Sequence, residues 1–322
     1  MSQKPFNDFI DLIDSLPRWS NCARREAKDK FEGTVGKGQS CGILSDVHAW
    51  LALVQADDRP IAGQIHLCLI AASIEGGQSP EVTKRLFDDI SRGRSLINRL
   101  CVPHGLGLRV LDMALDMPHR AAAAVPELDA AGTMAGVAFG MEATASGGDL
   151  IALGDMGPDS RLYAFCVIAA TAPALWQEMT RHQLVTEDDV ARVSEMCEPH
   201  IKAIEQTALR VRPLEVLRRL GGREMAAMCG AIAAASGQSL PLLLNGWSAL
   251  AAAVVLKYSA NNDDDQRILA HCMAASSQDM AQAWCWQALG MNTVLGVTGE
   301  MEPGLALPLA VSVVKASIDA HA

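Results

Sequence analysis

The chain has 322 residues, of which 50% are hydrophobic and 20% charged, so it can bury a sizeable core and is not an intrinsically disordered protein. Its 27 basic and 37 acidic residues give a formal net charge of −10 at pH 7, which argues against nucleic acid as a partner. Its nine cysteines, an odd number without short paired spacing, are typical of a reducing cytoplasm rather than of a disulfide framework.

The opening segment "MSQKPFNDFIDLIDSL" has acidic residues between its apolar positions. It is therefore predicted to be neither a secretory signal nor a transit peptide. The longest apolar region, 226–256, is interrupted by "SGQS" and by Asn245 into pieces shorter than the roughly 20 residues of a membrane helix. We expect a cytoplasmic protein without a membrane segment.

Short apolar runs along the chain predict strands, and their continuous rather than alternating hydrophobicity is typical of strands buried on both faces. The runs are 66–73, 106–115, 149–157, 239–247, 266–274 and 292–300. Helix-like segments lie between them at 81–101, 136–146, 187–203 and 223–235. This alternation predicts an α/β fold with a mostly parallel, Rossmann-like sheet of about six strands and flanking helices.

The two ends of the chain have a different character from its middle. The first fifty residues carry no strand pattern, and the segment after the last apolar run returns to helical composition. We therefore expect an α/β catalytic-type domain over 50–300 and a small helical subdomain made from 1–49 and 301–322.

Three of the apolar runs end in glycine-bearing turns. "GDMG" places Asp155 between glycines, Asn245 is followed by Gly246, and "GEMEPG" carries Glu300 and Glu302. Ligands of open α/β sheets bind outside the carboxyl ends of the strands. A glutamate of the last turn could therefore act as a general base, and the turn with Asp155 could bind a ribose hydroxyl or a phosphate. Alternatively, these carboxylates could be ordinary solvated turn residues.

The sequence shows no motif for a metal site, a cofactor site or a hydrolase. Cys197, His200, His271 and Cys272 lack the ligand spacing of a zinc site, so we predict no metal. No Walker loop, dinucleotide fingerprint or Gly-x-Ser-x-Gly elbow is present, and no cofactor is expected. The aspartate run 263–265 predicts a solvated loop.

The stretch "PLEVLRRLGGREMAAMCGAIAAASGQSLPLLLNGWSALAAA" resembles the nicotinate-nucleotide:dimethylbenzimidazole phosphoribosyltransferase family, which acts in assembling the lower ligand of cobalamin. Four further segments resemble the family in the same order: "SCGILSDVHAWLALVQ", "SPEVTKRLFDDISRGRSLINRL", "LIALGDMG" and "LGVTGEMEPGLALPL". The ordered agreement extends over most of the chain.

The resemblance implies roles for particular residues. Glu300, or alternatively Glu302, would be the base that takes the N–H proton when a benzimidazole-like base attacks ribose C1′ and displaces nicotinate. The remaining substrate-binding positions are Ser40 and Gly42 near the aromatic base, Thr83, and Gly154, Asp155, Met156, Gly157, Asn245 and Gly246, with the "GDMG" turn and Asn245-Gly246 near the ribose phosphate. The substrates would be nicotinate mononucleotide and the aromatic base, and no cofactor or metal is implied. A homodimer with active sites completed at the subunit interface is also implied.

The sequence departs from the family pattern where a ligand would sit. The family's Gly-Thr-Gly phosphate loop and following lysine are replaced by "TRHQLVTEDDVARV", with Val193 near the place of the lysine, and Gln78-Ser79 stands in place of Tyr-Pro. An alternative is therefore a non-catalytic homologue, either a ligand-binding regulator or the degenerate partner of an active paralogue in a heterodimer. A third possibility is an enzyme of the same fold in which Arg85 or Arg161 replaces the lysine.

Overall fold

The structure is a computed structural model that describes residues 4–75, 80–120, 122–126, 128–157, 160–260 and 266–321, with the backbone alone at 266 and 267. Gln78 and Ser79, and the aspartate run 263–265 that was predicted to form a solvated loop, lie outside the described residues.

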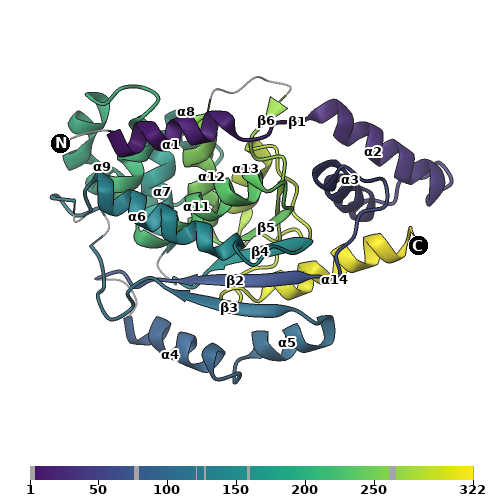
Figure 1. Cartoon of the computed structure of the whole chain (residues 1–322). Coiled ribbons are helices and arrows are strands. Elements are labelled where there is room, and N and C mark those ends of the chain that lie inside the picture. Colours follow the sequence, from purple (N-terminus) through teal and green to yellow (C-terminus); the bar gives the residue numbers. More distant parts are fainter. Residues whose placement is uncertain are drawn as a thin grey trace.

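The centre of the molecule is a five-stranded sheet in which every neighbouring pair is parallel (Figure 1). Its spatial order is β3-β2-β4-β5-β7. The strands are β2 Ile65–Ala71, β3 Gly107–Asp112, β4 Leu150–Asp155, β5 Leu242–Asn245 and β7 Cys272–Ala274. The predicted parallel α/β sheet is confirmed, and four of its strands fall within the first four predicted runs apart from Ile65 at the start of β2.

The last two predicted strands differ from the structure. Within 266–274, only β7 joins the main sheet, whereas β6 Gln266–Arg267 pairs antiparallel with the short β1 Trp19–Ser20. Segment 292–300 is not a strand; Thr293 and Val297 make isolated parallel bridges to Ala274 and Ser277. Gly296 and Gly299 explain the interruption, because their φ angles of +70° and +77° do not belong to an extended strand.

The helices surround the sheet. They are α1 Lys4–Ser15, α2 Asn21–Thr34, α3 Ile43–Gln55, α4 Pro80–Ser91, α5 Leu96–His104, α6 Ala130–Met141, the 3₁₀ turn η1 Glu142–Thr144, α7 Ser160–Thr171, α8 Pro173–Arg181, α9 Glu187–Glu205, α10 Arg212–Leu220, α11 Arg223–Gly237, α12 Trp247–Ser259, α13 Met280–Ala288 and α14 Ala306–Asp319. The single helix expected over 81–101 is divided into α4 and α5, because Gly93 takes a φ of +70° and Ser95 starts a new helix with a capping box. Among the described residues, no helix combines the length and the apolar character required to cross a lipid bilayer.

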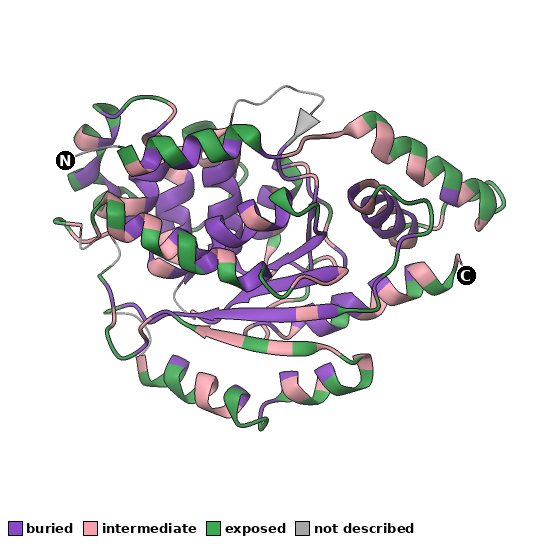
Figure 2. Cartoon of the chain, in the orientation of Figure 1, coloured by how far each residue is buried: buried purple, intermediate pink, exposed green. Residues whose placement is uncertain are grey.

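Four strands, β2, β4, β5 and β7, lie between cores on both faces of the sheet, which explains their continuous apolar runs (Figure 2). The prediction of burial on both faces is wrong for the edge strand β3, because none of its residues is buried. In β5, Leu242 and Leu244 belong to one core cluster with side chains from α6, α7, α11 and α12. Leu243, between them, belongs to the opposite cluster with side chains from α3, α5 and α14. Successive residues of a strand point to opposite faces, so a strand between two cores needs an apolar residue at every position.

Helices from the two ends of the chain lie on the same side of the molecule. Helix α14 runs beside α3, with α2 next to α3 (Figure 1). Helix α1 instead packs into the core on the α6 side through Phe6, Phe9, Ile10 and Ile13. The division into 50–300 and a terminal helical subdomain stays a prediction.

Helices α6 and α11 approach each other closely enough for backbone contact. A β-carbon at Gly140 of α6 would lie 1.8 Å from the carbonyl oxygen of Ala227. A β-carbon at Gly230 of α11 would lie 1.8 Å from the carbonyl oxygen of Val137. Only glycine fits either position.

Candidate active site

A cavity of about 260 Å³ lies at the carboxyl ends of β4, β5 and β7. It is lined by Asp155, Gly157, Ser160, Arg161, Asn245, Trp247, Ser276, Gln278, Thr298, Gly299, Glu300, Met301, Glu302, Pro303 and Ala306. Parallel strands end at one edge of a sheet, so loops far apart in the sequence converge there. The cavity is where the sequence pattern placed a ligand.

Part of the predicted site lines this cavity. Asp155, Gly157, Asn245, Glu300 and Glu302 are brought together, although they come from three separate loops. Their juxtaposition supplies carboxylates and an amide around a space large enough for part of a small molecule.

Other predicted residues lie next to the cavity without lining it. Gly154 is packed within β4, where an added β-carbon would lie 3.1 Å from Leu307 and 3.2 Å from Leu69. Met156 is completely buried, and its N–H donates to the carbonyl of Ile70 at 3.0 Å. These two residues shape the end of the strand.

A third group lies apart from the cavity. Ser40 and Gly42 precede α3, and the Ser40 hydroxyl accepts a hydrogen bond from the Gly42 N–H at 3.2 Å. Thr83 is buried in the first turns of α4. Neither the loop nor Thr83 is among the residues that line the 260 Å³ cavity of this chain.

Asp155 is held against the start of α12. Its Oδ2 atom accepts a hydrogen bond from the Ser248 N–H at 3.0 Å. Gly246 passes directly beside the carboxyl group, with a φ of +101°. Burial raises the pKa of Asp155 from its ordinary value, although hydrogen bonds from Ser248 and Ser160 act in the opposite direction. At a given pH, the neutral form of the Asp155 carboxyl is therefore more populated than that of an exposed aspartate.

The neighbouring Asn245 is also fixed. Its side-chain Nδ2 donates to the Ser276 hydroxyl at 3.2 Å, and the amide is buried. This bond links the ends of β5 and β7 across the cavity wall.

The loop that carries the two glutamates is held at both ends. The Thr298 N–H donates to the Ser277 carbonyl at 2.9 Å, and the Leu305 N–H donates to the Glu302 carbonyl at 3.0 Å. Gly304, with a φ of +75°, leaves no room for a side chain, because a β-carbon there would lie 2.5 Å from Leu69. These contacts therefore fix the backbone of the loop from which the Glu300 and Glu302 side chains extend.

The two glutamates differ in their surroundings. Glu300 is exposed, whereas Glu302 is half-buried. The Oε1 atom of Glu302 is buried and has no hydrogen-bond partner among the described residues. A buried carboxylate oxygen without a donor favours a ligand that brings an N–H or O–H group.

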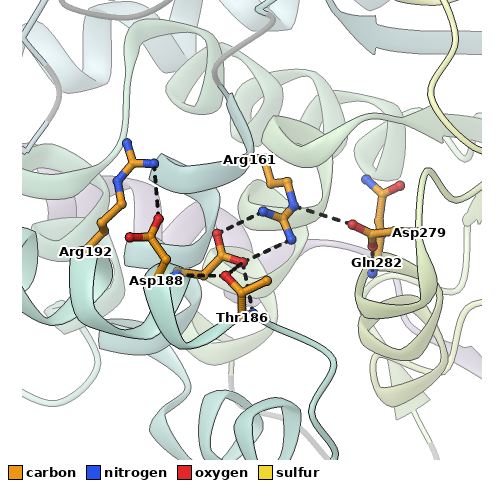
Figure 3. Close-up of polar contacts among 7 residues, drawn as sticks. Arg161, Thr186, Asp188, Arg192, Asp279 and Gln282 are labelled. Atoms are coloured by element: carbon orange, nitrogen blue, oxygen red, sulfur yellow. Dashed lines mark hydrogen bonds and ion pairs between the residues drawn. The ribbon is translucent and has the colours of Figure 1, made fainter.

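Arg161, in the first turn of α7, also lines this cavity. Figure 3 shows its polar contacts. Its Nη1 and Nη2 atoms donate to the two carboxylate oxygens of Asp189 at 3.0 and 3.4 Å. Its Nε lies 3.4 Å from Oδ2 of Asp279. The guanidinium carbon also lies 4.5 Å from the centroid of the Phe165 ring. Arg85, the other candidate for a replacement cation, is exposed on α4 and does not line this cavity.

Sequence reasoning missed several polar lining residues, namely Trp247, Ser276 and Thr298. It also missed a buried pair, His119 and Glu224, whose Nε2 and Oε2 atoms are 3.8 Å apart. Neither side chain has a hydrogen-bond partner among the described residues. Repulsion by the charge of Glu224 contributes to raising the pKa of Asp155. Nothing in one sequence connects a loop histidine with a helical glutamate.

The cysteine and histidine positions considered for a metal have other partners. In His271, Nδ1 lies 3.1 Å from the Ile268 carbonyl oxygen and Nε2 lies 3.0 Å from that of Ile232. Burial lowers the pKa of His271 to about 4. Within the described ranges, no cluster of three His, Cys, Asp or Glu side chains is suited to a metal ion.

Comparisons with known proteins show the family to which the chain is similar. The sequence model of a family described as phosphoribosyltransferase matches residues 16–322. The nicotinate-nucleotide–dimethylbenzimidazole phosphoribosyltransferase of Rhizobium meliloti (strain 1021) is 33% identical to the chain, covering 98% of the chain and 94% of that protein. The protein of the same name from Methylocella silvestris (strain DSM 15510) is also 33% identical, over 98% of the chain and 93% of its own length.

Solved structures show the same fold. The crystal structure of CobT from Thermus thermophilus matches with a TM-score of 0.74 and 20% sequence identity, covering 92% of this chain and 96% of that one.

Proposed function

The chain belongs to this phosphoribosyltransferase family, and from that membership we propose that it transfers phosphoribose from nicotinate mononucleotide to a benzimidazole-like base. This reaction would activate the lower ligand of a cobamide. The observation that carries the proposal is the meeting of Glu300 and Glu302 with Asp155, Asn245 and Arg161 around one cavity.

The proposed chemistry needs a proton acceptor beside the attacking ring. A nitrogen of the aromatic base attacks ribose C1′, and the bond from C1′ to the pyridinium nitrogen breaks. Nicotinate leaves with the bonding electron pair, which neutralises its ring charge. A glutamate of the 298–304 loop takes the N–H proton of the attacking base, so positive charge does not accumulate on the product ring.

We assign the base to Glu300, with Glu302 as the alternative. The exposed Glu300 can reach a substrate bound at the cavity mouth, and the resemblance matches it to the family's glutamate. The buried, unpartnered Oε1 of Glu302 supports the alternative. Asp155, Asn245 and the backbone at Gly154, Gly157 and Gly246 would shape the ribose side.

We further infer that Ser40 and Gly42 act in the site of a partner subunit. The resemblance places them near the aromatic base, yet they do not line the cavity of their own chain. A homodimer, or a heterodimer with a paralogue, would bring this loop to the neighbouring cavity. Mixing a Ser40→Trp variant with a Glu300→Gln variant should then restore transfer that neither shows alone; sedimentation of a monomer under assay conditions would contradict the shared site.

A cytoplasmic location is part of the same proposal. All nine cysteines are free thiols in the part of the chain that the structure describes, as suits a reducing compartment.

The test of the function is transfer by the purified wild-type chain. It is incubated with nicotinate mononucleotide and 5,6-dimethylbenzimidazole, and both nicotinate and the phosphoribosylated base are quantified by mass spectrometry. Equal amounts of the two products are expected. Absence of product, with donor binding retained in calorimetry, would instead support a ligand-binding regulator or a degenerate partner of an active paralogue.

A further inference from the structure

The ribose donor of the proposed reaction carries a phosphate, which a cationic side chain in the cavity could bind. Among its lining residues in the described part of the chain, Arg161 is the only lysine or arginine, while Asp155, Glu300 and Glu302 are acidic. Binding of a phosphate in this cavity therefore depends on which edge of the Arg161 guanidinium group is available to it.

A guanidinium group can bind oxyanions along different edges. One edge is formed by Nη1 and Nη2, and another by Nε and one Nη. Asp189 occupies the first edge with both carboxylate oxygens. At the Nε edge, Asp279 makes one ion pair of 3.4 Å.

The Asp189 side of Arg161 is fixed. The Asp189 side chain is 10% exposed, and its Oδ2 accepts hydrogen bonds from the Thr186 N–H and hydroxyl at 3.1 and 2.9 Å. Burial opposes ionisation of Asp189, but the bonds from Thr186 and Arg161 outweigh it and lower its pKa. This carboxylate stays charged and orients the guanidinium.

The ion pair between Arg161 and Asp279 is less firmly held than the one with Asp189. The Asp279 side chain is 39% exposed, and its Oδ1 already accepts the Gln282 N–H at 2.8 Å as the N-cap of α13. An exposed ion pair contributes little to stability, so an incoming oxyanion can replace it at Nε. In Figure 3, Arg161 lies between Thr186, the N-cap of α9, and Asp279.

Neutral donors complete the same wall. Trp247 lines the cavity, is 1% exposed, and has an Nε1–H without a hydrogen-bond partner among the described residues. Ser276 also lines it, and because its hydroxyl oxygen accepts from Asn245, its O–H can still donate. Arg161 lies in the first turn of α7, where the helix dipole favours an anion.

We propose that Arg161 binds the 5′-phosphate of the ribose donor through its Nε edge, and that Asp279 competes with the phosphate for that edge. The inference rests on the proposed function and names the residue that distinguishes a nucleotide donor from a nucleoside donor. Asp189 is a positioning residue that holds the other edge.

The test compares two donors, nicotinate mononucleotide and its phosphate-free riboside. In Arg161→Gln, the ratio of kcat/KM for the nucleotide to that for the riboside should fall about tenfold to a hundredfold, since two charged hydrogen bonds are lost. Asp279→Asn should lower KM for the nucleotide severalfold. Arg192→Gln is the matched control, because Arg192 pairs with the exposed Asp188 at 4.0 Å and does not line the cavity.

The outcomes separate the inference from the proposed function. Equal losses for both donors in Arg161→Gln, or no loss, would overturn the phosphate assignment while transfer by the wild type stands. If the wild type transfers neither donor, calorimetry with nicotinate mononucleotide decides: weaker binding by Arg161→Gln and tighter binding by Asp279→Asn support the site, and unchanged binding by both refutes it. If Arg161→Gln does not fold, Arg161→Lys, which keeps the charge and loses the forked edge, takes its place.

Discussion

The Asp155 carboxyl group lies so close to Gly246 that a β-carbon at position 246 would approach Oδ1 to 2.0 Å. Two neighbouring strand ends, β4 and β5, are thereby packed against each other without an intervening side chain. Gly246 also carries a φ of +101°, a conformation that L side chains rarely adopt.

Gly246→Ala should therefore destabilise the fold and reduce donor binding together. The clash and the φ strain together should cost about 2–4 kcal/mol of unfolding free energy, measured by urea denaturation. Gly296→Ala is the control, because Gly296 has a φ of +70° but nothing within 4 Å of an added β-carbon. Equal losses in the two variants would show that the contact with Asp155 is unimportant.

Asp155→Asn should change how stability depends on pH. The ordinary pKa of this carboxyl is 3.8, and burial raises it in the folded state. Between 3.8 and the raised value the native state holds more protons than the unfolded state, so this group lowers the unfolding free energy as pH rises through that window. The variant lacks this loss, so its unfolding free energy relative to wild type should increase as the pH rises from 3.8 through the raised folded-state pKa of Asp155. A pH-independent difference would contradict the buried, titrating carboxyl.

Glu215 in α10 should affect the pH dependence of stability in the opposite direction to Asp155. Its buried carboxylate accepts from Arg218 Nη2 at 2.6 Å and from Arg219 Nε at 2.5 Å. Burial alone would raise its pKa, but the two arginines outweigh burial and lower it below the ordinary 4.5.

Glu215→Gln should consequently cost about 3–5 kcal/mol at pH 7, since two partly buried guanidinium groups lose their counter-ion. The stabilisation by Glu215 is present above pH 4.5 and is lost as pH falls through the lowered folded value, so wild type and variant should converge in acid. Thermal unfolding at pH 7 and at several pH values below 4.5 measures both effects, and a gap that stays the same size as the pH falls would argue against the ion pair as its cause.

Glu300→Gln and Glu302→Gln test the base. Loss of a positioned general base should reduce kcat about 10² to 10⁴-fold, without a comparable change in thermal stability, because both side chains lie on a loop. The larger loss identifies the base. Rates within about twofold of wild type for both variants would remove the carboxylates from the mechanism.

Gly140→Ala and Gly230→Ala test the helix contact. Each β-carbon would fall 1.8 Å from a carbonyl oxygen, so each variant should lose about 1–3 kcal/mol or more. Gly33→Ala in α2 is the helical control, because its β-carbon would meet nothing within 4 Å, and it should gain up to about 1 kcal/mol from helix propensity. Stabilisation in all three would mean that the helices can separate freely.

The sequence predicts the sheet well where the pattern is local. Runs such as 66–73 are apolar at nearly every position because each strand lies between two cores, and this requirement is visible in the sequence itself. Segment 292–300 was wrongly predicted as a strand because its apolar residues follow a strand-like pattern. The positive φ angles of Gly296 and Gly299, which prevent a strand, are set by the loop in which these glycines lie and cannot be read from the local sequence.

The site is predicted less completely because its contacts join distant segments. Asp155 and Glu300 stand out by their glycine-flanked turns. The position of Arg161 between Asp189 and Asp279 follows from the packing of α7, α9 and α13, which no local pattern records. The same holds for His119 and Glu224.

The glycine contact between α6 and α11 also limits how the site can move. Gly140 meets Ala227 and Gly230 meets Val137, so a small slide of one helix along the other would bring the β-carbons of neighbouring residues against backbone atoms. The first turn of α11 is in turn tied to the loop after β3, where Arg223 Nη1 donates to the Met117 carbonyl at 2.7 Å. The close contact therefore favours movement of the two helices together on ligand binding, and leaves the loops to close over a substrate.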